Sequence, residues 1–205
     1  MCHVNRSRLM TLSRRTTMND DILLVRRIKE GDQSCFSQLV ERYQKPLYRY
    51  LRRLGLDHDE AADVMQNSFV RAWNNLSSLH EDGNFRSWLY TIASNQAKNW
   101  FRSRSRLAAL EQSADSFMDE SSDQDREMDR EKMRNWLDSA LNRLPDVQRQ
   151  VVILRAFEDT PFVAVAEICG MSLTAAKVSY HRALKKMAIW LKPVKQQVNL
   201  RDGRE

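Results

Sequence analysis

The stretch from Phe85 to Arg106 combines three kinds of side chain that single-stranded nucleic acid binds. It contains five basic residues, five aromatic residues, three side-chain amides and no acid. Aromatic rings stack on unstacked bases, each contributing roughly 1–3 kcal/mol, while amides bond to base edges and arginines neutralise phosphates. An amphipathic helix whose rings lie in a protein core has a similar composition. The stretch alone therefore leaves both interpretations open.

Helical periodicity divides this stretch into two faces, and we expect a helix from about Arg86 to Arg104. The side expected to pack in the core carries Leu89, Ile92, Ala93, Ala97 and Trp100. The opposite side carries amides and cations without an acid, namely Asn95, Lys98, Asn99 and Arg102. A polar face of this kind indicates nucleic-acid binding more specifically than amphipathicity does.

A second candidate for nucleic-acid binding lies near the C-terminus. Thr160 is expected to cap a short helix with Pro161 at its first position, and Gly170 to end it in a left-handed conformation. Ser172 is then expected to cap the next helix. Two helices joined by a tight glycine turn predict a helix-turn-helix, whose second member can lie in the major groove of DNA.

The second helix of this pair should have a buried side and an acid-free outer side. The buried side is expected to hold Leu173, Ala176, Tyr180, Ala183 and Met187. The outer side is expected to hold Thr174, Lys177, Val178, His181, Arg182 and Lys185. An ordinary helical hairpin with a solvated lysine face is the alternative interpretation.

The elements that position these surfaces are expected to be helices. The chain has 205 residues, 42% of them hydrophobic, with only 5 Gly and 4 Pro, which favours long helices and short turns. Its net charge is +6, but the stretch from Glu111 to Glu131 alone carries −7, so the remainder carries +13. An acidic block between two basic blocks predicts polyanion binding at two places.

These patterns predict an all-α fold of two small helical domains joined by an acidic flexible linker. We expect a disordered basic tail over residues 1–19, in which Met18 is a possible translation start. The remaining expected boundaries are 20–106 for the first domain, 107–132 for the linker, 133–192 for the second domain and 193–205 for a C-terminal tail.

The first domain should begin with helices between Asp21 and Arg53, broken at Gly31, with Pro46 as a kink or restart. Asp57 is expected to cap a further helix. The buried stripe expected in that helix is Ala61, Met65, Phe69, Ala72 and Leu76. Its other face is expected to place Asp63, Gln66, Asn67 and Asn74 around Val70. Periodicity alone favours the interpretation that this polar face is simply exposed to solvent and binds no partner.

No motif in the sequence indicates catalysis, a metal or another cofactor. His58 with Asp59 and Glu60 could suggest a metal hydrolase, but no second ligand cluster supports that reading. Cys35 and Cys169 are expected to be core thiols, with redox sensing as the alternative. Without a run of 18 apolar residues or an apolar leader region, the expected location is the cytoplasm, with no direct membrane insertion.

Two separate stretches resemble one protein family in the right order. The N-terminal stretch contains FSQLVERYQKPLYRYLRR, DVMQNSFVRAW and FRSWLYTIASNQAKNW, and the C-terminal stretch runs from LPDVQRQVVILRAFEDTPF to YHRALKKM. Together they resemble the extracytoplasmic-function group of bacterial RNA polymerase sigma factors, over roughly residues 21–190. The resemblance implies sigma domain 2, sigma domain 4 with its helix-turn-helix, and a non-enzymatic factor that directs transcription initiation at particular promoters, often in a stress response.

The resemblance also implies roles for the faces described above. Core RNA polymerase would bind through its largest-subunit clamp helices to Asp63, Gln66, Asn67 and Arg71. The melted −10 element would contact Phe85, Trp88, Tyr90, Asn95, Lys98, Asn99 and Arg102, together with the loop after Leu76. The −35 duplex would contact Thr174, Lys177, Val178, His181, Arg182 and Lys185. The linker would thread towards the RNA exit path, and an anti-sigma factor would cover the polymerase-binding faces.

The recognition helix departs from the family at two places. Many members begin it with Gly-Thr-Val where this chain has Thr174-Ala175-Ala176, and Ser179 replaces a frequent basic residue. The resemblance therefore does not imply a −35 preference. Two other functions remain as alternatives: a dimeric helix-turn-helix regulator that binds DNA alone, and a small helical enzyme that uses His58 with nearby carboxylates.

Overall fold

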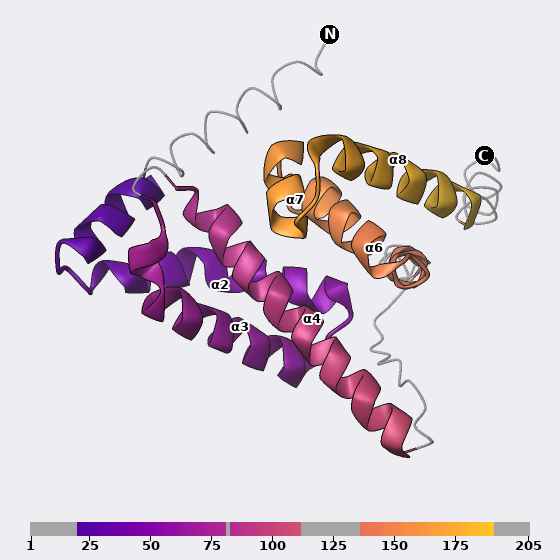
Figure 1. Ribbon diagram of the computed structural model, residues 1–205, viewed down its shortest axis with the longest axis horizontal. Coiled ribbons are helices and arrows are strands. Elements are labelled where there is room, and N and C mark those ends of the chain that lie inside the picture. The colour runs from indigo at the N-terminus through magenta and orange to yellow at the C-terminus, as the bar shows by residue number, and fades with distance from the viewer. Residues whose placement is uncertain (1–19, 81–82, 112–135, 191–205) are drawn as a thin grey trace, which may run out of the picture. The chain divides into compact units, whose positions relative to one another are not determined.

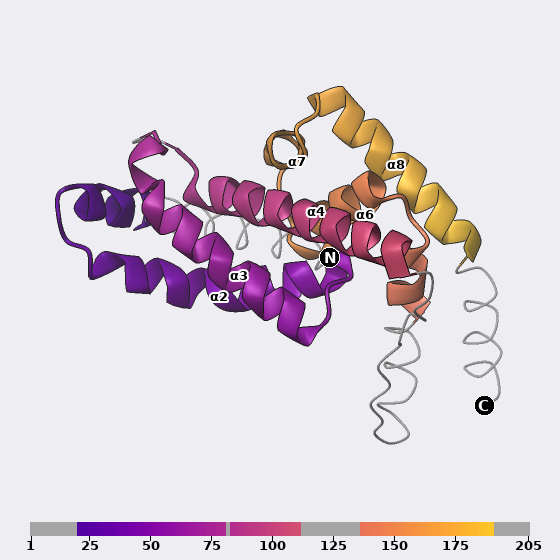
Figure 2. The same ribbon diagram turned by 60° about the horizontal axis from the view of Figure 1, so that its bottom comes forward.

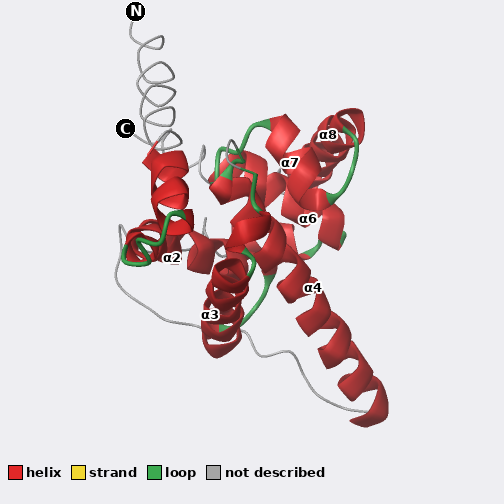
Figure 3. Ribbon diagram, turned by 60° about the vertical axis from the view of Figure 1, so that its left-hand side comes forward, coloured by secondary structure: helices red, strands yellow, loops and turns green. Residues whose placement is uncertain are grey.

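Every regular element in the described part of the chain is helical, as predicted (Figures 1 and 3). The computed structural model describes residues 20–80, 83–111 and 136–190, so the predicted basic tail, most of the linker and the C-terminal tail lie outside it. The chain forms two compact units. The first includes residues up to Leu51 and Asp57–Ala97, and the second includes Arg52–Leu56 and the residues from Lys98 onward.

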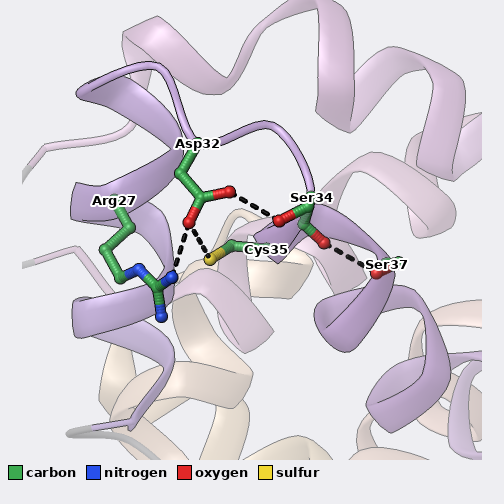
Figure 4. Close-up of polar contacts among 5 residues, drawn as sticks. All are labelled: Arg27, Asp32, Ser34, Cys35 and Ser37. Atoms are coloured by element: carbon green, nitrogen blue, oxygen red, sulfur yellow. Dashed lines mark hydrogen bonds and ion pairs between the residues drawn. The ribbon is translucent and has the colours of Figure 1, made fainter.

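The first unit begins with a helix over residues 20–29, which is followed by α2 (Cys35–Leu54). Gly31 separates the two helices with φ +110°, a conformation that glycine adopts readily. The Asp32 carboxylate accepts hydrogen bonds from Ser34 at 2.5 Å, Cys35 at 3.3 Å and Arg27 at 2.5 Å (Figure 4). These bonds, that from Ser34 foremost, lower the pKa of Asp32 to about 2.

Asp21 ties the 20–29 helix to α2. Its buried carboxylate accepts hydrogen bonds from the Arg42 guanidinium and the Tyr43 hydroxyl, so the charge is paired where water does not reach. Burial nevertheless raises the pKa of Asp21. Burial, with the nearby Asp21 charge, likewise raises the pKa of Tyr43.

Helix α2 runs through Pro46 without a break, so the predicted possibility of a restart there is wrong. Proline in a helix interior removes one backbone hydrogen bond. The packing of α2 offsets that loss, because its inner face is fully covered. The side chains on this face are Leu39, Tyr43, Leu47, Tyr50 and Leu51.

Helix α3 (His58–Asn74) begins with the cap expected at Asp57. The Asp57 carboxylate accepts from the Glu60 N–H at 2.8 Å, while the Glu60 carboxylate accepts from the Asp57 N–H at 2.7 Å. The expected stripe is buried at Ala61, Phe69, Ala72 and Leu76, and Met65 is half-buried. A one-turn 3₁₀ helix, η1 (Leu76–Ser78), follows.

Helix α4 (Phe85–Glu111) continues well past the predicted end near Arg104. Figures 1 and 2 show α2, α3 and α4 side by side. Aromatic contacts join α2 to α4, since Tyr43 lies 5.6 Å from Phe85 and Tyr50 lies 4.9 Å from Tyr90 between ring centroids. The Tyr50 hydroxyl also lies 2.7 Å from the Ser94 hydroxyl, which satisfies both buried groups.

The second unit contains α6 (Asp146–Val152), η2 (Ile153–Phe157, a π-helix), α7 (Phe162–Cys169) and α8 (Leu173–Trp190). The predicted cap at Thr160 is wrong by one residue. Pro161 is the N-cap and makes no side-chain cap bond. Thr160 instead bonds to the preceding segment, since its N–H donates to the Leu154 carbonyl at 2.8 Å and its hydroxyl to the Glu158 carbonyl at 3.5 Å.

The turn between α7 and α8 has the predicted geometry. Gly170 is left-handed at φ +65°, its N–H bonds to the Glu167 carbonyl, and the Met171 N–H bonds to the Ala166 carbonyl, which ends the helix. The Ser172 hydroxyl accepts from the Ala175 N–H at 3.2 Å and so caps α8. A bend of 97° between α7 and α8 is that of a helix-turn-helix.

Among the described residues, no single helix is long and apolar enough to cross a membrane. Helices α7 and α8 reach the required length and composition only as a pair, across the 97° bend.

Candidate nucleic-acid interfaces and a docking groove

An apolar groove of about 450 Å³ lies between α2 and α3 in the first unit. Phe36 and Trp73 form one wall, with ring centroids 5.0 Å apart in an edge-to-face arrangement. Val70 is 52% exposed and Trp73 is 36% exposed, so water contacts large apolar side chains here. The residues that line the groove are Phe36, Val40, Gln44, Ala62, Met65, Gln66, Phe69, Val70 and Trp73.

The polar face of α3 borders this groove. All four residues assigned to polymerase binding are exposed, namely Asp63, Gln66, Asn67 and Arg71. Gln66 belongs both to this face and to the groove lining. The small polar groups therefore lie next to an apolar hollow, an arrangement typical of a protein-binding surface with a polar rim.

Helix α4 presents the expected polar face. Asn95, Lys98, Asn99 and Arg102 are all exposed, at helical positions that share one side. Leu89, Ala93 and Ala97 are buried behind them. Ile92 and Trp100, which were also expected in the core, are half-buried. An acid-free row of amides and cations thus faces solvent on a firmly packed helix.

The aromatic residues of α4 divide into covered and accessible rings. Phe85 and Tyr90 are each 1% exposed because they pack against Tyr43 and Tyr50, so in this structure neither ring offers a face to a base. The contact of Phe85 and Tyr90 with the melted strand, which the resemblance implies, stays a prediction. Trp88 is half-buried and remains accessible, beside Phe85 at 6.0 Å between ring centroids.

The outer face of α8 agrees with the expected set, because Thr174, Lys177, Val178, His181, Arg182 and Lys185 are all exposed. Ala176, Ala183 and Met187 are buried and Tyr180 is half-buried. Leu173, expected to be buried, is 40% exposed. Leu173 is the first residue of α8.

The histidine and thiol candidates for chemistry have ordinary structural partners. His58 Nδ1 lies 2.6 Å from the Tyr48 hydroxyl. Within residues 20–80, 83–111 and 136–190, no group of three His, Cys, Asp or Glu side chains could hold a metal ion. Burial raises the pKa of Cys35, and raises that of Cys169 to about 11, so neither thiol is activated as a thiolate.

Comparison with known proteins identifies two regions of the chain. Family models for Sigma-70 region 2 and Sigma-70 region 4 match residues 39–107 and 134–187. The chain is 32% identical over 153 residues to the RNA polymerase sigma factor YlaC of Bacillus subtilis, covering 74% of this chain and 88% of that protein. It is 30% identical over 174 residues to the ECF RNA polymerase sigma-E factor of Salmonella typhimurium strain LT2, covering 80% and 90%.

The two regions define a sigma factor of the sigma-70 class. The chain belongs to its extracytoplasmic-function family. It is therefore a non-enzymatic RNA polymerase subunit that binds core polymerase and promoter DNA and directs transcription initiation.

Solved structures agree with this assignment. CnrH in complex with the cytosolic domain of CnrY is similar with a TM-score of 0.67 at 26% identity, over 84% of this chain and 97% of that one. The sigma factor RpoE in complex with the anti-sigma factor NepR from Bartonella quintana is similar with a TM-score of 0.63 at 25% identity, over 77% and 96%.

The groove between α2 and α3 was not predicted from the sequence. Phe36, Val40 and Met65 have the spacing of core residues, and periodicity cannot show that the two helices leave a hollow between them. The signal that was available is Val70, an aliphatic residue in the middle of an otherwise polar face, because it suggests a partner that covers this surface.

Proposed function

We propose that this sigma factor melts the −10 element on α4 and reads the −35 element on α8. The observation that carries the proposal is the pair of exposed, acid-free polar faces, one on helix α4 and one on helix α8. The two faces differ in composition, and each composition suits one form of DNA.

The α4 face is suited to a separated strand. Asn95 and Asn99 can bond to base edges that pairing would otherwise occupy, Lys98 and Arg102 can neutralise phosphates, and Trp88 can stack on an unstacked base. Because these contacts exist only once the strands separate, they draw the promoter towards the melted state. Melting then needs no chemical step, only preferential binding.

The α8 face is suited to duplex DNA. It begins just after the glycine turn, so the N-terminal half of the helix would enter the major groove. Lys177 and Arg182 can donate to guanine edges or to phosphates, and Val178 can contact a thymine methyl group. His181 and Thr174 complete a surface that reads several neighbouring base pairs.

Core polymerase would dock on the groove between α2 and α3. Val70 and Trp73 supply apolar area, while Asp63, Gln66 and Arg71 supply the polar rim that fixes orientation. The solved relatives bound to CnrY and to NepR support a further step, in which an anti-sigma factor covers this chain's polymerase-binding faces. Because it acts on promoter DNA together with core polymerase, the factor would act in the cytoplasm.

The docking surface can be tested by adding a charge to the groove. Val70→Glu places a carboxylate in apolar surroundings and should weaken binding to core polymerase at least tenfold, measured by fluorescence anisotropy of labelled factor. Leu23→Glu is the matched control, because Leu23 is 56% exposed and lies outside the groove. Equal binding of core polymerase by both variants would contradict this docking site.

A further inference from the structure

Lys29 joins two parts of the first unit that are far apart in sequence. Its ammonium group, at the end of the 20–29 helix, donates a hydrogen bond to the Leu79 carbonyl and lies 3.5 Å from the Ser77 carbonyl. Forty-eight and fifty residues separate Lys29 from these acceptors. Both carbonyls belong to η1 and the residue that follows it, on the path from α3 to α4.

The carbonyls that Lys29 contacts lie at the C-terminal end of a helix. The last carbonyls of a helix have no intrahelical partner, and they carry the negative end of the helix dipole. A cation that bonds to them is therefore favoured, and a charged donor makes a stronger bond than a neutral one. No side chain caps the N-terminal end of η1, and the Leu79 N–H bonds back to Leu76.

The helix that carries Lys29 is itself held firmly. Leu24, Val25 and Ile28 are buried, and the buried Asp21 carboxylate bonds to two side chains of α2. The backbone of Lys29 is therefore held in place, and its side chain extends from it to the η1 turn.

The other end of this connection is also tightly constrained. A Cβ atom on Gly83 would lie 2.7 Å from Leu79 Cδ1 and 2.8 Å from the His80 carbonyl, so only glycine fits there. Asn84 then accepts a bond from the Ser87 N–H at 3.1 Å at the start of α4. Leu76 and Leu79 are buried, which fixes the turn from beneath.

We infer that Lys29 is a positioning residue for capture of the melted −10 strand: it fixes the turn Leu76–Leu79 so that the strand meets a preformed surface at the start of α4. The inference rests on the proposed role of α4 and the turn before it. Lys29 contacts no DNA in this account. It holds the turn in its bound conformation before DNA arrives, so that less conformational entropy is lost when the strand binds.

The test uses holoenzyme and a single-stranded oligonucleotide from the non-template strand of a promoter at which the wild-type factor initiates. A series of such oligonucleotides carries one abasic site each. Wild-type holoenzyme should lose roughly tenfold in affinity at the captured base. Lys29→Met should lose most of this discrimination, Lys29→Arg should retain it, and Arg26→Met on the same helix, with the same change of charge, should match the wild type.

Hydrogen exchange of the free factor supplies a readout that does not depend on DNA. In Lys29→Met, the Ser78 and Leu79 amides should exchange faster while amides in the middle of α2 keep their protection. Loss of protection throughout α2 and α4 would make Lys29 a general structural residue and overturn the inference.

The outcomes also separate this inference from the proposed function. If Lys29→Met discriminates abasic sites as the wild type does, the role of Lys29 is wrong and strand capture on α4 stands. If the wild-type holoenzyme binds every oligonucleotide equally, strand capture itself is wrong, and the inference falls with it.

Discussion

Helices α4 and α8 both expose acid-free faces, but they expose different kinds of side chain. The α4 face offers two asparagines, a half-buried tryptophan and cations, whereas α8 contains no amide and offers cations, aliphatic groups and a histidine. Amides and aromatic rings bind most favourably to bases that are unpaired and unstacked, because the base edges and faces are then accessible. Arginine and lysine suit the acceptor edges and phosphates of an intact duplex. This difference in composition matches the two DNA forms that we propose for the two helices, a melted strand for α4 and a duplex for α8.

The supports of the two helices differ as well. Helix α4 is held by side-chain packing across α2, with aromatic pairs and a buried hydroxyl pair. The start of α8 is set by backbone geometry, through the left-handed Gly170 and the Ser172 cap. Substitutions can therefore weaken one helix without touching the other.

The largest expected effect comes from the α4 face. Asn95→Ala removes an exposed side chain, so the free energy of unfolding should change little. Open-complex formation should weaken by roughly 1–3 kcal/mol, with binding to core polymerase intact. The measurement is permanganate reactivity of melted thymines on a promoter that the wild type opens. Unchanged reactivity would remove Asn95 from the site.

A somewhat smaller effect is expected at the glycine turn. Gly170→Ala places a Cβ in open space, so its cost is the left-handed backbone alone, roughly 1–2 kcal/mol of unfolding free energy. Gly170→Asn should cost less, since asparagine tolerates this conformation. Residue-resolved hydrogen exchange should show the loss in α7 and α8 and leave α2 unaffected. Equal stability of all three proteins would contradict the role given to the turn.

A third change separates the two faces by their salt dependence. Lys177→Ala should weaken binding of holoenzyme to −35 duplex DNA, and should lower the slope of log affinity against log salt by about 0.9 if the ammonium contacts a phosphate. Asn95→Ala should leave that slope unchanged because it removes no charge. Titrations at several salt concentrations make the comparison. If the slope of log affinity against log salt changed for Asn95→Ala and not for Lys177→Ala, the assignment of the −35 duplex to α8 would be contradicted.

The smallest expected effects concern stability at acid pH. Among the described residues, both carboxyl groups whose pKa is shifted lie in the first unit. The pKa of Asp32 is lowered to about 2, so its stabilisation is present above pH 3.8 and is lost as pH falls towards 2. Asp32→Asn should therefore cost stability near neutral pH and little at pH 2. The pKa of Asp21 is raised, so its contribution runs the other way, and stability declines as pH rises from 3.8 through that raised value.

Urea unfolding of the wild type, Asp32→Asn and Asp21→Asn between pH 2 and 7 measures both effects. The loss of unfolding free energy caused by Asp32→Asn should grow as the pH rises. For Asp21→Asn, the unfolding free energy should instead rise relative to that of the wild type as the pH rises. The same pH trend in both variants would show that one of the two environments is misassigned.

Local features of the fold could be predicted from the sequence, since local residues determine them. The Asp57 cap, the Gly170 turn and the Ser172 cap each need only a few neighbouring residues. Thr160 shows where a local rule fails. Its N–H donates to the carbonyl of Leu154, six residues earlier and inside a π-helix, and no cap pattern contains that information.

Features that depend on packing between distant segments could not be predicted. Phe85 and Tyr90 belong to a stretch rich in exposed polar groups, yet two tyrosines of α2 cover them. The groove beside Val70 and the bond from Lys29 to Leu79 likewise join segments far apart in the chain. Composition indicated nucleic-acid binding, but only the fold shows which rings remain accessible.

The most direct test of this account is transcription reconstituted from purified parts. Core polymerase with this factor should initiate at a specific promoter, core polymerase alone should not, and the factor alone should not bind the same promoter duplex specifically. Tight, specific binding of the promoter by the factor without polymerase, and no promoter-specific transcript with it, would contradict the account.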